Sequence, residues 1–108
     1  MKRGDLVTIA QKGDYEGKPR PAVVIQSDLF DAMDSVTVCL LTGEAADAAI
    51  LRPTLEPDAL NNLRARSWVQ IDKIATIRRA RVGKIFGRLS PADMRRVTAS
   101  LIVFLGIA

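Results

Sequence analysis

The 108-residue sequence contains no histidine and only one cysteine. Without histidine, the Ser–His–Asp and Cys–His arrangements and an imidazole general base are excluded. One cysteine cannot form an internal disulfide, and the chain has too few of the usual ligands for a zinc site. It also has no glycine-rich phosphate loop and no dinucleotide fingerprint, so we expect no metal and no cofactor. Any catalysis must therefore use Arg, Asp, Glu, Ser or Thr together with the substrate's own groups.

Long hydrophobic runs are missing as well. The longest neutral run, residues 97–108, is too short to cross a bilayer, and residues 1–5 lead into a charged turn rather than an apolar signal segment. A single cysteine is typical of the reducing cytoplasm, where we expect this protein, and the length suits one domain, 1–108. Cys39 lies within the apolar segment 36–41 and is expected to be a buried strand residue rather than a nucleophile.

Positive charge is concentrated in the second part of the chain. Residues 1–63 hold 6 Lys or Arg and 10 Asp or Glu, a net charge of −4, whereas residues 64–108 hold 10 and 2, a net charge of +8. All ten of these cations fall between Arg64 and Arg96. Such a segment favours binding to a polyanion or to an acidic protein segment, although a solvated basic face without a partner has the same composition.

The segment 18–25, Lys-Pro-Arg-Pro-Ala-Val-Val-Ile, is the most informative in the chain. Each proline fixes its own φ and pushes the residue before it toward extended geometry. Arg20 is thus held on a stiff backbone at the beginning of an apolar strand. The segment indicates an arginine directed at a ligand, or alternatively a turn with a solvated arginine.

Apolar patterns predict several short strands, over residues 6–10, 22–26, 35–41, 49–55, 67–71 and 75–77. The strand over 49–55 contains Pro53, which favours an edge position. A C-terminal helix begins after Ser90, a good N-cap, with Pro91 in the first position, and Gly106 ends it. We expect Met94, Val97, Leu101 and Leu105 to form its buried face. The last turn is apolar all round, which predicts packing against a second copy of the chain. The fold class is α+β: a small curled sheet closed by one C-terminal helix.

Five segments, taken in order, resemble the MazF/PemK (also called Kid) family of toxin ribonucleases. They are residues 4–7, 18–25, 38–42, 67–77 and 87–90, and together they span nearly the whole chain. The resemblance implies an SH3-like barrel with a C-terminal helix, assembled as a homodimer. It also implies an mRNA interferase, a metal-independent and sequence-specific endoribonuclease that cleaves single-stranded RNA through the substrate's 2′-hydroxyl. A cognate antitoxin with an acidic, flexible tail is the implied inhibitor.

Carried over by position, the family's key arginine falls on Arg20 and its key Thr or Ser falls on Thr42. An arginine is a poor proton acceptor, so Arg20 would stabilise charge on the phosphate or donate a proton to the leaving oxygen. Thr42 would donate a hydrogen bond to a phosphate oxygen, although a hydroxyl here could also simply close a turn.

The chain departs from the family in two places. Some members have a histidine in the first loop, where Tyr15 and Glu16 are the nearest candidates here. The Kid-type Arg–x–Asp pair reads Gln70-Ile71-Asp72, so its arginine is missing. Asp72 could orient Arg20, handle a proton, or be an ordinary surface carboxylate.

Further RNA contacts are expected from loops and from the basic segment, and Trp68 could either stack on a base or pack in the core or dimer. The expected RNA-binding residues are Tyr15, Glu16, Lys18, Gln26, Ser27, Gln70, Lys73, Arg78 and Arg79.

The competing function is a non-catalytic DNA gyrase poison of the CcdB type, which has the same fold, and residues 104–107 faintly resemble that branch. A third possible function is that of an RNA- or antitoxin-binding module without activity. Arg20 and Thr42 favour the nuclease, because a poison does not need them.

Overall fold

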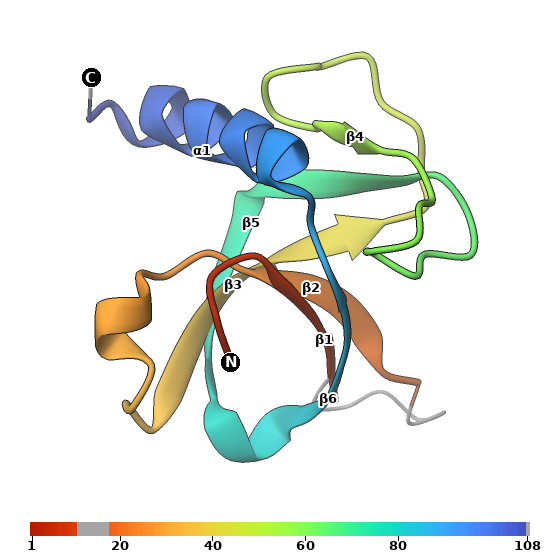
Figure 1. Ribbon diagram of the computed structural model, residues 1–108. Coiled ribbons are helices and arrows are strands. Elements are labelled where there is room, and N and C mark those ends of the chain that lie inside the picture. The colour runs from red at the N-terminus through yellow and green to blue at the C-terminus, as the bar shows by residue number, and fades with distance from the viewer. Residues whose placement is uncertain (11–17, 108) are drawn as a thin grey trace.

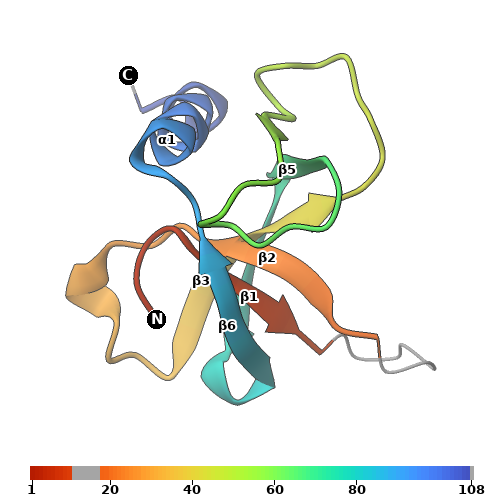
Figure 2. The same cartoon turned by 45° about the vertical axis from the view of Figure 1, so that its right-hand side comes forward.

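The computed structural model describes residues 1–10 and 18–107. Its strands form one antiparallel sheet in the order β4-β5-β3-β2-β1-β6, which curls so that β6 lies beside β1 (Figures 1 and 2). Helix α1 lies across the first half of β5 (Figure 1). The elements are β1 (Asp5–Ile9), β2 (Arg20–Val24), the 3-10 turn η1 (Asp28–Phe30), β3 (Ser35–Thr42), β4 (Thr54–Leu55), β5 (Ser67–Arg78), the 3-10 turn η2 (Arg79–Arg81), β6 (Val82–Arg88) and α1 (Pro91–Leu105). The expected α+β class, a curled sheet with a C-terminal helix, is confirmed.

Alternation along the strands divides the apolar side chains between two clusters. The helix-side core lies between the sheet and α1, and the barrel core lies on the other face of the sheet. The buried residues of the helix-side core are Leu6, Val23, Cys39, Leu41, Leu55, Val69, Ile71, Leu89, Val97 and Leu101. Those of the barrel core are Val7, Ile9, Ala22, Val24, Val36 and Val38. Any side chain of β2 or β3 can therefore be assigned to a face by its position in the strand.

The expected signals at both ends of α1 are confirmed. The Ser90 hydroxyl accepts a hydrogen bond from the Asp93 N–H at 3.1 Å, and Gly106 ends the helix at φ +68°. Val97 and Leu101 are buried as expected, but the expectation that Leu105 is buried is wrong, since it is 52% exposed. The last turn of α1 lies past the bend of β5, where there is no sheet for it to cover (Figure 1).

The strands differ from expectation at three places. The strand expected over 49–55 is reduced to β4, because a turn closed by the Arg52 N–H and the Ala48 carbonyl, at 2.8 Å, precedes it. Its edge position is confirmed. The strands expected over 67–71 and 75–77 are one bent strand, β5.

Within the described ranges, no helix has the length and apolar character needed to span a membrane.

Strand β6 is absent from the sequence-based expectation. It contains Gly83 and Gly87, and glycine disfavours strands. A Cβ on Gly83 would lie 2.4 Å from Thr8 Oγ1, and one on Gly87 would lie 2.4 Å from the Asn61 carbonyl oxygen. At Gly87 the obstructing atoms are backbone, so the close approach of the loop before β5 requires glycine there, whereas at Gly83 the Thr8 side chain would have to move.

Candidate functional site

Arg20, Thr42 and Trp68 form a row across three neighbouring strands. The β2–β3 register pairs Ala22 with Leu40, so its continuation by two residues places Arg20 opposite Thr42. Thr42 in turn pairs with Trp68 of β5. Opposed residues of antiparallel strands share a face with their Cβ atoms about 5 Å apart, so the row spans about 10 Å. By this register, the arginine and the threonine that the sequence singled out lie at neighbouring positions of β2 and β3.

Arg20 is the first residue of β2 and is exposed. It pairs with Ile9 of β1, while the next residue, Pro21, pairs with Thr8. Because neighbouring residues of a strand face opposite ways, Pro19 and Pro21 lie on the other face of the sheet from Arg20. The guanidinium therefore projects from a backbone that is fixed by two prolines and by pairing with β1.

Thr42 is the last residue of β3 and is half-buried. Its hydroxyl oxygen accepts a hydrogen bond from the Glu44 N–H at 3.1 Å, which closes the turn after the strand. No acceptor for the hydroxyl hydrogen is found within residues 1–10 and 18–107. The turn-closing role and a donor role toward a ligand are therefore compatible in one side chain.

Asp72 is held by an arginine that the sequence reasoning did not select. Arg52 contacts the Asp72 carboxylate with its Nη2 atom at 3.1 Å, and its Nη1 atom donates to Gln70 Oε1 at 3.1 Å. The side chains of Arg52 and Asp72 are 20% and 30% exposed. In the described part of the chain, the recorded ion-pair partner of Asp72 is thus Arg52 and not Arg20. The only signal for Arg52 in the sequence was its position as a charged residue in an expected edge strand. The sequence could not give the register of that strand.

Gln70, Asp72 and Lys73 lie where β5 bends. The register with β3 shifts there: Leu41 pairs with Val69 and Cys39 with Ile74, so residues 70–73 lie opposite Leu40 alone. Such a bulge bends a strand and redirects its side chains. Since Val69, Ile71 and Ile74 pack in or against the helix-side core, Gln70 and Asp72 are assigned to the face of Trp68 and Thr42. Lys73 is exposed at the same bend.

Four of the expected RNA-binding residues lie at the other end of β3. Arg78 pairs with Ser35, the first residue of β3, which puts it about 20 Å along the strand from Thr42. Gln26 accepts from the Thr37 N–H at 2.9 Å, and Ser27 caps η1. The Arg79 guanidinium donates to the carbonyls of Asp31 and Met33. Within one chain these four side chains do not join the Arg20–Thr42 row.

Of the candidate residues in the first loop, Lys18 belongs to the described part of the chain. Lys18 is exposed and precedes Arg20 by two residues, so it lies close to the row. Tyr15 and Glu16, the candidates in place of the family's histidine, lie outside the described residues.

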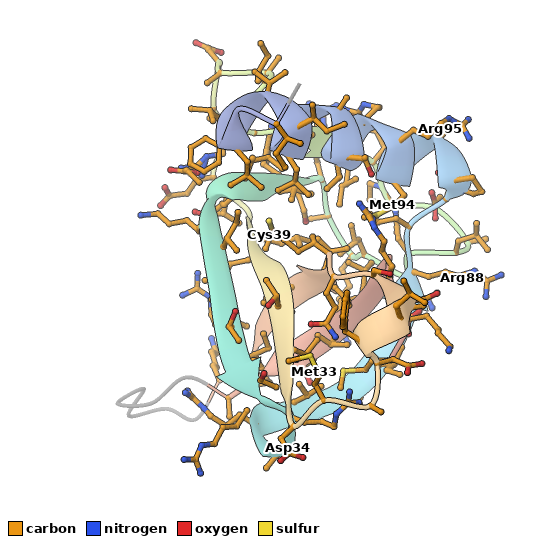
Figure 3. All side chains as sticks on the ribbon, turned by 90° about the vertical axis from the view of Figure 1, so that its left-hand side faces the viewer. Met33, Asp34, Cys39, Arg88, Met94 and Arg95 are labelled. Atoms are coloured by element: carbon orange, nitrogen blue, oxygen red, sulfur yellow. The ribbon has the colours of Figure 1, made fainter. Side chains whose placement is uncertain are left out.

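The cations between Arg64 and Arg96 do not gather into one patch. Arg66 pairs with Glu56 at 3.0 Å, Arg81 donates to the Ala10 carbonyl, and Arg96 binds Asp93 and the Thr54 carbonyl. Figure 3 shows Arg88 and Arg95 directed outward on one side of the molecule, while Asp34 lies at the end far from α1. The positive charge is therefore spread over several elements and partly neutralised.

A cavity lies on the other side of β2 from Arg20. Its volume is about 490 Å³, and it is lined by Thr8, Pro19, Pro21, Asn62, Leu63, Arg64, Lys84 and Phe86. Because Thr8 and Pro21 share the face of Leu6 and Val23, this cavity is the open end of the helix-side core. It is not part of the Arg20–Thr42 row.

Cys39 is fully buried in the helix-side core, as expected. Burial, and to a smaller extent the charge of Asp72, raises the pKa of the Cys39 thiol to about 12. A thiol with such a pKa is not a nucleophile at neutral pH. Among residues 1–10 and 18–107, no three Cys, Asp or Glu side chains gather as a metal site would need.

The curled antiparallel sheet closed by one C-terminal helix is the fold that the resemblance to the MazF/PemK family implies. Residues 2–105 match the family described as PemK-like, MazF-like toxin of type II toxin-antitoxin system. The chain belongs to this family, and the resemblance expected from the sequence is confirmed.

Individual relatives agree with this assignment. The chain is 46% identical over 108 residues to a probable endoribonuclease MazF of Mycolicibacterium smegmatis, covering 100% of this chain and 99% of the relative. A mycobacterial endoribonuclease solved in complex with its cognate antitoxin has a TM-score of 0.82 at 20% identity, with 100% and 97% of the two chains covered. A MazE–MazF structure from Deinococcus radiodurans has a TM-score of 0.81 at 21% identity, with 100% and 98% covered. The comparisons support an RNA-cleaving toxin rather than a gyrase poison.

Proposed function

We propose that this protein is a toxin that cleaves single-stranded RNA, above all mRNA, in a sequence-specific and metal-independent way. The β2–β3 register carries this proposal, because its continuation puts Arg20 opposite Thr42 at the end of the sheet face that holds the barrel core. Full-length similarity to a probable endoribonuclease supports it.

The substrate supplies the nucleophile. The 2′-hydroxyl oxygen bonds to the adjacent phosphorus while the bond from phosphorus to the 5′-oxygen breaks, which leaves a 2′,3′-cyclic phosphate and a 5′-hydroxyl. One proton leaves the 2′-hydroxyl and one is delivered to the 5′-oxygen. Negative charge grows on the phosphate oxygens in the transition state, where a fixed guanidinium and a hydroxyl donor are most effective. We assign charge stabilisation to Arg20 and hydrogen-bond donation to Thr42.

The neighbouring side chains suit a single strand of RNA. Trp68 is half-buried next to Thr42 and offers a ring on which a base could stack. Lys18, two residues before Arg20, and Lys73, at the bend of β5, are exposed and would contact phosphates. Gln26, Ser27, Arg78 and Arg79 could contribute only to a longer RNA, since they lie at the other end of β3.

A cognate antitoxin with an acidic, flexible tail is the proposed inhibitor, and the working form is proposed to be a homodimer. Two of the structural neighbours are toxins described with their antitoxins. Exposed apolar side chains at the end of α1 support the dimer: Val103, Phe104, Leu105 and Ile107 are 44–72% exposed.

The proposal predicts that replacing Arg20 stops cleavage without unfolding the protein. We expect Arg20→Ala to lower the cleavage rate of a mixed single-stranded RNA in EDTA by about 10²-fold or more, because the transition-state charge loses its fixed cation. The matched control is Arg95→Ala, which removes an exposed cation from α1 and should cleave like the wild type.

Products are identified by their 5′-hydroxyl ends, and folding by circular dichroism. Full cleavage by Arg20→Ala would remove this residue from the mechanism. Wild-type protein that leaves RNA intact but traps gyrase on DNA would support the CcdB-type alternative instead.

A further inference from the structure

Arg52 occupies a fixed position beside the Arg20–Thr42 row. Strand β4 pairs Thr54 with Trp68, and this ladder continues through hydrogen bonds from Val69 N–H to the Pro53 carbonyl, at 2.9 Å, and from Ile71 N–H to the Leu51 carbonyl, at 3.1 Å. The same register puts Arg52 opposite Gln70. Cross-strand partners share a face, so Arg52 lies on the face of Trp68 and Thr42, one pair further along β5.

The guanidinium of Arg52 joins two side chains of the β5 bend. It donates to Gln70 Oε1 and contacts the Asp72 carboxylate, each at 3.1 Å, and the Arg52 and Asp72 side chains are 20% and 30% exposed. Gln70 stands where the Kid-type motif has an arginine. Here the guanidinium that meets the aspartate comes from the neighbouring segment of the chain instead.

We propose that Arg52 is a positioning residue for RNA cleavage, which fixes Asp72 and cancels its charge next to the Arg20–Thr42 row. This inference rests on the proposed function. Without Arg52, an unpaired carboxylate would face the path of the RNA phosphates, and like charges at an interface are strongly unfavourable. Arg52 thus acts through Asp72 and not by touching the RNA.

The test is the binding of a fully 2′-O-methylated oligonucleotide, which cannot be cleaved, measured by fluorescence anisotropy. We expect Arg52→Gln to weaken binding about tenfold at low salt, because the Asp72 carboxylate then repels the phosphates. The loss should shrink as salt rises, since screening relieves this repulsion. The double variant Arg52→Gln/Asp72→Asn should bind within about threefold of the wild type, because the repelling charge is gone. A purely structural contact would not show this salt dependence.

The matched control is Arg66→Gln, which also removes one cation but breaks an exposed ion pair, Arg66–Glu56. We expect it to weaken binding less than about threefold. Melting temperatures of all variants show whether folding is preserved.

Several results would overturn the inference. If the double variant binds as weakly as Arg52→Gln, Arg52 contacts RNA itself; if Arg52→Gln behaves like Arg66→Gln, it has no special role. If Asp72→Asn alone abolishes cleavage of unmodified RNA at unchanged binding, Asp72 belongs to the chemistry, and a role for Arg52 that is limited to fixing Asp72 and cancelling its charge is refuted. Wild-type protein that binds but never cleaves would refute only the proposed function.

Discussion

At the scale of single residues, the site depends on how firmly the backbone holds each candidate residue. Arg20 starts from a backbone fixed by Pro19 and Pro21, and Thr42 from a strand end closed by its own hydroxyl. Preorganised donors stabilise transition-state charge because they need not reorganise during the reaction. The backbone of Arg52 is likewise held in place, by the ladder of hydrogen bonds that continues β4. The two arginines differ in role because Arg52 pairs with the carboxylate of Asp72, whereas Arg20 is exposed.

Cys39 gives a prediction at this scale. We expect the thiol of the folded protein to react with a disulfide reagent at pH 8 about 100-fold more slowly than in denaturant, because burial raises its pKa to about 12 and blocks access. Release of the chromophore, followed with time in both conditions, measures this. Rapid reaction without denaturant would show that the helix-side core opens readily around β3.

The same thiol makes stability depend on alkaline pH. Its pKa in the folded state, about 12, lies above the unfolded value of about 8.5. It therefore contributes stability that is fully present below pH ~8.5 and is lost as the pH rises toward 12, because only the unfolded chain releases the proton in this window. A Cys39→Val protein should lose less stability over this range.

At the scale of elements, β6 shows how a strand can form against its own composition. Its two glycines permit a close approach, since a Cβ at either position would lie 2.4 Å from an atom of a neighbouring segment. The strand is held by pairing with β1, through Asp5–Arg88 and Leu6–Gly87, rather than by propensity. Tertiary contacts therefore override the local preference of this segment.

Gly87→Ala tests this close approach. The added Cβ would lie 2.4 Å from the Asn61 carbonyl oxygen and 2.7 Å from its carbonyl carbon, so backbone must shift. We expect the free energy of unfolding to fall by about 1–3 kcal/mol in urea denaturation. The matched control is Gly43→Ala, where nothing lies within 4 Å of the added Cβ, and the change should stay within about 0.5 kcal/mol. Equal stability of the two variants would mean that the contact at Gly87 relaxes without cost.

At the scale of the whole molecule, the end of α1 leaves several apolar side chains uncovered. Val103 and Ile107 are 62% and 72% exposed, and Ile50 in the loop before β4 is 58% exposed. A single chain leaves these groups in water, which is unfavourable by about 25 cal/mol per Å² of apolar area. A second copy that covers the last turn would remove this penalty, as the resemblance to a dimeric family implies.

The dimer is tested by sedimentation at micromolar concentration. We expect two chains per particle for the wild type and one for Val103→Lys, because a charge cannot be buried unpaired in such an interface. Lysine suits the last turn of a helix, so α1 should remain folded. The control is Met33→Lys, which changes another exposed apolar residue, 50% exposed compared with 62% for Val103, near η1 and far from α1 (Figure 3). A monomeric wild type would contradict the prediction.

The sequence by itself determined the elements whose causes are local. Ser90, Pro91 and Gly106 place the ends of α1, alternating apolar residues place β1 to β3, and the order of five segments identifies the family. The same local rigidity marked Arg20 as a candidate functional residue. None of these inferences needed to know which strands are neighbours.

Only the tertiary structure decided what depends on register and close approach. Sequence cannot show that Arg52 faces Gln70 and Asp72, because a shift by one residue would turn Arg52 to the other face. It cannot show that Gly87 is needed in a strand, since the atoms that require it belong to Asn61. It also placed Arg78 and Arg79 with the site by charge alone, whereas the pairing of Arg78 with Ser35 moves them to the other end of β3. Distances between segments far apart in sequence come from packing, and the composition of each segment does not contain them.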